Sequence, residues 1–177
     1  TTKGDTDTRP LFTIEQKGIF EKEIDKAVAE REVDFAVHSL KDVPSQLADN
    51  LIIASIPKRE KVNDVFISSD GSSLDKIKPG SIIGTSSLRR AVQVTRQRSD
   101  VTVKPIRGNI ETRIKKISGE HFDAIVLAQA GISRLGVDVN FTSLSTDDFS
   151  PSPGQGAIAI VARTDDSQTI EMLKKIE

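Results

Sequence analysis

Short apolar runs alternate with amphipathic helical patterns along most of this chain. The apolar runs are typical of buried strands and occupy residues 51–56, 65–67, 82–83, 101–106, 124–127 and 157–161. Apolar residues recur at helical spacing over residues 87–97, 109–118, 129–135 and 166–176. Because strands alternate with helices, the pattern predicts an α/β fold with a largely parallel sheet.

The start of the chain carries one helix and one strand. Phe20, Ile24 and Val28 fall on one helical face, which predicts an amphipathic helix over residues 17–31. The apolar run 33–37 predicts a buried strand that opens into a polar loop. This strand has no evident partner earlier in the sequence, so we expect the start of the domain to lie outside it.

Composition argues against several kinds of site. The 177 residues include 25 basic and 26 acidic side chains and no Cys, Trp or Tyr, with His38 and His121 as the two histidines. Disulfides and cysteine metal sites are therefore excluded from this chain, and base-stacking surfaces are disfavoured. No apolar run approaches the ~18 residues of a membrane span. We expect a cytoplasmic protein with no metal site that binds neither nucleic acid nor membrane.

Positive charge is concentrated between residues 85 and 116, which hold nine basic and two acidic side chains. Within residues 84–90 a strand passes through a Thr-Ser-Ser turn into a helix, so hydroxyl and N–H groups gather at the helix N-terminus. Arg89 and Arg90 then place cations at the positive end of the helix dipole. This unfavourable placement predicts an anion site, although both side chains could simply reach solvent.

A second basic segment follows the next predicted strand. Arg107 ends the run 101–106, at the sheet edge where open α/β sheets bind ligands, and Arg113 lies in the following helix. The neighbouring Lys115 and Lys116 are better explained as a solvated helix face. Arg134, at the end of a later helix, fits either interpretation.

Three further features are candidates of lower specificity. Asp42 follows a predicted strand, where it is either a functional carboxylate or an Asx-turn residue. His38 lies on an apolar strand and is better explained as a satisfied core histidine than as a catalyst. Residues 154–156, Gly-Gln-Gly, predict a tight turn into a strand, and without the Walker lysine they are weak evidence for a phosphate loop.

Four motifs together resemble the porphobilinogen deaminase (hydroxymethylbilane synthase) family. In chain order they are residues 38–44, His-Ser-Leu-Lys-Asp-Val-Pro; 84–90, Gly-Thr-Ser-Ser-Leu-Arg-Arg; 107–113, Arg-Gly-Asn-Ile-Glu-Thr-Arg; and 154–157, Gly-Gln-Gly-Ala. Segments 2–5 and 17–20 are also similar to the family, so the resemblance covers essentially the whole chain.

The resemblance implies a transferase of tetrapyrrole biosynthesis, the route to porphyrins and heme. Such an enzyme condenses four porphobilinogen molecules head to tail, releases ammonia at each addition and yields hydroxymethylbilane. Its partners would be porphobilinogen and linear polypyrrole intermediates, and it would be a monomer. Each pyrrole carries an acetate and a propionate, which forked guanidinium groups bind well.

The resemblance also assigns roles to individual positions. Asp42 matches the catalytic aspartate, whose carboxylate bonds the pyrrole N–H groups and stabilises the cationic azafulvene formed when ammonia leaves. Lys17 and Lys41 match basic residues that line the same cleft. Positions that contact cofactor or substrate carboxylates are matched by Thr85, Ser86, Ser87, Arg89, Arg90, Arg107, Arg113 and Arg134.

The fold implied is a pair of type II periplasmic-binding-protein-like α/β domains around a cleft. Residues 1–57 with 158–177 would form the first domain, incomplete at its N-terminus, and 58–157 the second. The family has a third domain whose cysteine holds the dipyrromethane cofactor; this chain has no cysteine, so we expect an inactive fragment. The main alternative is a non-catalytic carboxylate-binding module of the same fold; RNA binding through residues 85–116 is the weakest alternative.

Overall fold

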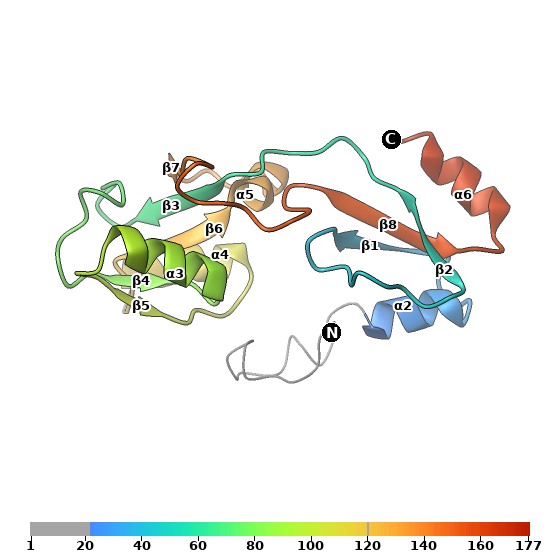
Figure 1. Cartoon of the computed structure of the whole chain (residues 1–177), viewed down its shortest axis with the longest axis horizontal. Coiled ribbons are helices and arrows are strands. Elements are labelled where there is room, and N and C mark those ends of the chain that lie inside the picture. Colours follow the sequence, from blue (N-terminus) through green and yellow to red (C-terminus); the bar gives the residue numbers. More distant parts are fainter. Residues whose placement is uncertain (1–21, 120) are drawn as a thin grey trace. The chain divides into compact units, whose positions relative to one another are not determined.

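The computed structural model describes residues 22–119 and 121–177, which form two units (Figure 1). One unit contains residues 22–60 and Pro153–Glu177, and the other contains Lys61–Ser152. The chain leaves the first unit after residue 60 and returns at residue 153. The sequence-based prediction places the two crossings after residues 57 and 157.

The first unit is a three-stranded antiparallel sheet with one helix on each face (Figure 1). Its strands lie in the order β1 (Phe35–Ser39), β8 (Ile158–Arg163), β2 (Leu51–Ser55). Val28 of α2 (Lys22–Ala29) packs on one face, and Leu173 of α6 (Ser167–Lys174) packs on the other. Both faces of the central strand β8 are therefore covered.

The prediction of a buried strand over residues 33–37 is wrong. Burial alternates along β1: Ala36 and His38 are buried, whereas Phe35 and Val37 are 38% and 55% exposed. Among the described residues β1 stands at the edge of the sheet, and α6 packs on β2 and β8. One face of β1 therefore lacks the helix that covers its neighbours.

The helix predicted over residues 17–31 is observed as α2, and its first part, residues 17–21, lies outside the described residues. The described helix ends at Ala29, and Arg31 adopts a left-handed φ of 65°. The Arg163 guanidinium donates to the carbonyl of Val28 at 3.1 Å. This contact ties the end of α2 to the central strand.

The second unit is a five-stranded sheet between two helical layers (Figure 1). Its strands lie in the order β5 (Thr102–Lys104), β4 (Ile82–Gly84), β6 (Ala124–Ala128), β3 (Asp64–Ser68), β7 (Thr142–Ser143). Val94 of α3 (Leu88–Gln97) packs on one face, while α4 (Ile110–Gly119) and α5 (Gln129–Leu135) cover the other through Ile117 and Ile132. The predicted strands and helices are thus found close to their expected positions.

The prediction of a largely parallel sheet is wrong. In the described part of the chain, the parallel pairs are β4 with β5 and β4 with β6; β3 is antiparallel to β6 and β7, and β8 is antiparallel to β1 and β2. A parallel neighbour requires a crossover, usually through a helix. Strands β3 and β8 instead enter their sheets from the two segments that connect the units.

Among the described residues, no helix is long and apolar enough to cross a membrane.

Candidate active site

The connection between β4 and α3 folds as the sequence predicts. The Thr85 hydroxyl accepts a hydrogen bond from the Ser87 N–H at 3.2 Å, which closes the turn. Ser87 is the N-cap of α3, and its hydroxyl accepts from the Arg90 N–H at 3.4 Å. These hydroxyls satisfy donors that the turn and the first helical turn leave open, so they shape the loop directly.

Ser86 joins this connection to the one between β5 and α4. Its hydroxyl donates to the Ile106 carbonyl at 2.7 Å and accepts from the Ile106 N–H at 3.1 Å. Ile106 is 2% exposed, so both of its backbone groups depend on protein partners. One hydroxyl therefore fixes the two basic loops relative to each other.

Arg89 and Arg90 share a carboxylate that lies inside the second unit. Arg90 donates through Nε and Nη2 to Asp64 Oδ1 at 3.0 and 2.7 Å, and through Nη1 to the Val126 carbonyl at 3.4 Å. Arg89 Nη2 lies 2.8 Å from Asp64 Oδ2. Asp64 is fully buried and Arg90 is 7% exposed. One carboxylate thus serves two guanidinium groups, and it offsets part of the unfavourable charge at the start of α3.

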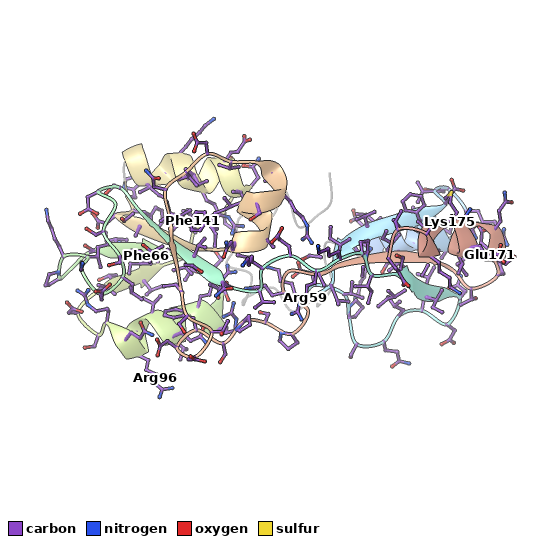
Figure 2. All side chains as sticks on the ribbon, turned by 90° about the horizontal axis from the view of Figure 1, so that it is seen from above. Arg59, Phe66, Arg96, Phe141, Glu171 and Lys175 are labelled. Atoms are coloured by element: carbon purple, nitrogen blue, oxygen red, sulfur yellow. The ribbon has the colours of Figure 1, made fainter. Side chains whose placement is uncertain are left out.

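Sequence reasoning missed Asp64. A charged residue directly before the apolar run 65–67 is the signal that could have drawn attention to it, because such a carboxylate is buried only when it is paired. The other arginine of α3 behaves differently: Arg96 projects from the helix into solvent (Figure 2). Asp64 therefore distinguishes the two arginines at the start of α3 from the one near its end.

The connection between β5 and α4 holds its cations through backbone carbonyls. Arg113 Nε donates to the Gly108 carbonyl at 2.6 Å, and Lys116 Nζ donates to the Arg107 carbonyl at 2.9 Å. Gly108 has a φ of 117°, a conformation that favours glycine. Arg107 and Arg113 are both half-buried, so their charge is concentrated in a partly desolvated loop.

The pKa of Arg113 shows how its surroundings act on a positive charge in this loop. Burial lowers the pKa of its guanidinium, and the positive charges of Arg90 and Arg107 lower that pKa further. Arg113 is therefore repelled by two other guanidinium groups, those of Arg90 and Arg107. A bound anion would relieve this repulsion, which fits the predicted anion site.

The first unit carries the predicted carboxylate, Asp42, just after β1. Its N–H donates to the Ser39 carbonyl at 2.9 Å, so the backbone turns tightly at the strand end. The Asp42 residue is exposed and Lys41 is half-buried. Asp42 therefore lies at the surface of the protein on a hydrogen-bonded turn.

His38 is a buried core residue, as the sequence analysis favoured. Its Nε2 lies 2.8 Å from Asp25 Oδ1 of α2, and the two side chains are 6% and 14% exposed. The pair connects β1 to α2 beneath the turn that carries Asp42. Its contacts explain why an imidazole occurs on this strand.

Two further residues were predicted to belong to the site. Arg134 is exposed in the last turn of α5, where a cation is favourable at the negative end of the helix dipole. Lys17 lies outside the described residues. Among the described residues, no group of three or more His, Cys, Asp or Glu side chains is placed to hold a metal ion.

The fold places the chain in the class of periplasmic-binding-protein-like structures. An ancestral cationic amino acid solute-binding protein superposes with a TM-score of 0.54, covering 87% of this chain and 66% of that one. The two sequences are 10% identical, so the likeness concerns the fold. This agrees with the type II fold class predicted from the sequence.

Sequence comparison identifies the family within that class. The family model for porphobilinogen deaminase, dipyromethane cofactor binding domain, matches residues 1–171. A probable porphobilinogen deaminase of Nitrosopumilus maritimus is 85% identical over all 177 residues, and a porphobilinogen deaminase of Listeria innocua is 50% identical over 171. The chain belongs to the porphobilinogen deaminase family, as its motifs predicted. It spans 57% and 55% of the lengths of these relatives.

The described residues fit one part of what a dipyrromethane group requires. The resemblance implies acidic side chains on each pyrrole, and the half-buried Arg107 and Arg113 suit such anions. The chain has no cysteine, so it cannot supply the thioether attachment that the family uses. The basic loops can therefore hold the acidic groups, while covalent attachment needs a residue from elsewhere.

Proposed function

We propose that the complete protein containing this chain condenses four porphobilinogen molecules, with loss of one ammonia from each, and releases the product by hydrolysis with one water as hydroxymethylbilane. Family membership supports this activity. The observation that carries it to this chain is the half-buried pair Arg107 and Arg113: burial lowers the pKa of the Arg113 guanidinium, and the positive charges of Arg90 and Arg107 lower that pKa further. A site for repeated dicarboxylate units needs permanent cations whose mutual repulsion is relieved by the ligand.

In this proposal the arginines divide into two groups. Arg107 and Arg113 bind the acetate and propionate groups, because both residues are half-buried and the Arg113 guanidinium is held in place by the Gly108 carbonyl. Arg89, which is partly exposed, contributes a second contact. Arg90 holds the loop through its bonds to Asp64.

Asp42 supplies the negative charge for the chemical step. A carboxylate fixed beside the cation that develops as ammonia leaves stabilises the transition state more than the ground state. Asp42 is exposed, and its backbone is held by a turn, so its position at the surface is defined. Lys41, and Lys17 by resemblance, add positive charge for the substrate carboxylates.

The test is turnover by the complete protein. Porphobilinogen is supplied, and ammonia and hydroxymethylbilane are quantified, while intact mass reports any dipyrromethane adduct. We expect Asp42→Asn to fold normally and to lose about 10²–10³-fold in kcat. Asp49→Asn, a change at another exposed aspartate of the same unit, is the matched control and should retain activity. Wild-type turnover in Asp42→Asn would remove Asp42 from its role.

A second candidate is a carboxylate-binding module without catalysis, which the likeness to a solute-binding protein favours. Such a module would bind porphobilinogen reversibly and release no ammonia. The turnover assay separates the two candidates directly. Our proposal also includes a monomeric, cytoplasmic enzyme, as the family resemblance implies; light scattering of the complete protein and cell fractionation test these two properties.

A further inference from the structure

The turn at residues 153–157 packs against the loop that carries Asp42. The Leu40 N–H donates to the Ala157 carbonyl at 3.0 Å, and the Ala157 N–H donates to the Gly154 carbonyl at 3.1 Å. Leu40 lies two residues before Asp42, whose own N–H is bonded to the Ser39 carbonyl. The start of the Asp42 loop is therefore tied directly to this turn.

The turn is itself held from its other side. The Arg59 Nε donates to the Gln155 carbonyl at 3.0 Å, and the Glu60 N–H donates to the Gly156 carbonyl at 2.9 Å. Arg59 lies on the segment that leaves β2 (Figure 2). Gln155 is 1% exposed. A turn with bonds on both sides and a buried centre is a rigid support for the loop that it contacts.

Gly154 brings the two backbones closer than a residue with a Cβ atom ordinarily allows. A Cβ atom there would lie 3.0 Å from Leu40 Cγ, 3.0 Å from the Lys41 backbone N and 3.1 Å from the Leu40 carbonyl carbon. Two of these are backbone atoms, which cannot rotate away. Gly154 also has a positive φ of 72°, but so do Gly71 and Gly80, at 76° and 80°, where a Cβ would meet nothing within 4 Å. The close approach is therefore a separate requirement at position 154.

We propose that Gly154 is a positioning residue for Asp42. It lets the turn at 153–157 set the main-chain path of Leu40 and Lys41, and thereby the direction in which the Asp42 carboxylate points. The inference rests on the proposed function of Asp42. Electrostatic stabilisation depends on preorganised geometry, and displacement of such a group by about 1 Å can cost roughly 10²-fold in rate.

The test compares Gly154→Ala with Gly71→Ala in the complete protein. Both changes place a Cβ on a left-handed residue, and only the first pushes on the Asp42 loop. For Gly154→Ala we expect kcat to fall about tenfold or more with KM within about threefold. Backbone amide exchange in residues 39–43 should accelerate in the same variant. Gly71→Ala should lower thermal stability and leave kcat and this exchange unchanged.

A second variant keeps the proposal testable if Gly154→Ala does not fold. Asparagine tolerates positive φ better than alanine does, so Gly154→Asn retains the Cβ clash with less backbone strain. A folded Gly154→Asn or Gly154→Ala with wild-type kcat and exchange would overturn the proposal. In the wild-type protein, a Leu40 amide that exchanges as fast as an exposed one would overturn it without any variant.

The outcomes also separate this inference from the proposed function. A wild-type protein that releases no ammonia from porphobilinogen overturns the function, whatever the exchange data show. An active wild-type protein in which Gly154→Ala leaves kcat and exchange unchanged overturns the role of Gly154 alone.

Discussion

The two basic loops of the second unit hold their arginines in opposite electrostatic settings. In the β4–α3 loop, Arg90 is buried against Asp64, a fully buried carboxylate that also contacts Arg89. In the β5–α4 loop, Arg113 donates to a backbone carbonyl, and its pKa is lowered by burial and further by neighbouring cations. The first setting compensates charge within the protein, whereas the second leaves charge that a ligand can compensate.

The difference teaches that residue type alone does not identify an anion-binding arginine. A guanidinium with a buried carboxylate partner belongs to the core, and its removal should destabilise the fold. A guanidinium beside other guanidiniums carries repulsion in the unliganded protein, and its removal should mainly weaken binding. The following changes test each side of this contrast.

The largest effect is expected for Asp64→Asn. The change leaves the buried Arg90 guanidinium without its countercharge, which typically costs about 3–5 kcal/mol of unfolding free energy. Urea denaturation measures this cost. Asp138→Asn, an exposed aspartate in the same unit, is the control and should change stability by less than about 0.5 kcal/mol. Equal, small losses in both variants would show that the Asp64 pair does not stabilise the fold.

Arg113→Gln should produce the reverse pattern. Loss of a charge-assisted hydrogen bond of about 1.5–3 kcal/mol predicts roughly 10- to 150-fold weaker affinity of the complete protein for porphobilinogen. The free energy of unfolding should change by less than about 1 kcal/mol, because a partly desolvated charge beside other cations is removed. Lys115→Gln, on the exposed surface of the same helix, is the control. A large loss of stability with unchanged affinity would place Arg113 with Arg90 in the core.

Ser86→Ala tests the connection between the two loops. The change removes the hydroxyl that bonds both the N–H and the carbonyl of the buried Ile106. The free energy of unfolding, measured by urea denaturation, should fall by about 1–3 kcal/mol. Because the β5–α4 loop loses its anchor, affinity for porphobilinogen should fall as well. Ser99→Ala, at an exposed serine, provides the comparison. Stability and affinity equal to those of Ser99→Ala would mean that the loops are fixed independently.

Much of the fold was predictable because hydrophobic periodicity reports local structure. The helix predicted over 87–97 is observed as α3, and the run 124–127 is observed within β6. Periodicity does not report which strand comes to lie beside which. The antiparallel direction of β3 and β8 and the half-exposed face of β1 follow from chain connections and helix placement. The two-residue strand β7 is too short to carry a periodic signal.

In the candidate site, too, the local features were predictable from the sequence and the long-range contacts were not. The turn chemistry of Ser87 and the placement of Arg107 directly after a predicted strand are local features, and both were visible in the sequence. Asp64 contacts Arg90 across 26 positions of the chain, so only the tertiary fold reveals that the two charges meet. The same is true of Gly154, whose close neighbour Leu40 lies in a distant segment.

The smallest effect concerns the ion pair between Arg98 and Asp100 at the end of α3. Like Asp64, Asp100 accepts from an arginine, but its carboxylate is exposed whereas that of Asp64 is buried. Arg98 donates through Nε and Nη2 to Asp100 at 2.8 Å in both contacts, and these bonds lower the pKa of Asp100. A carboxylate whose folded pKa lies below its unfolded value of about 3.9 stabilises the fold above that pH. The contribution is lost as the pH falls through the lower folded pKa.

Asp100→Asn should therefore lower the Tm slightly between pH 5 and pH 7, and the difference from wild type should vanish once acidification has passed the lowered folded pKa of Asp100. Calorimetry across this pH range measures the effect, and added salt should reduce it because the pair is exposed. Asp138→Asn should show no such pH dependence. A Tm difference that persists unchanged at the lowest pH would mean that Asp100 stabilises the fold through something other than its charge.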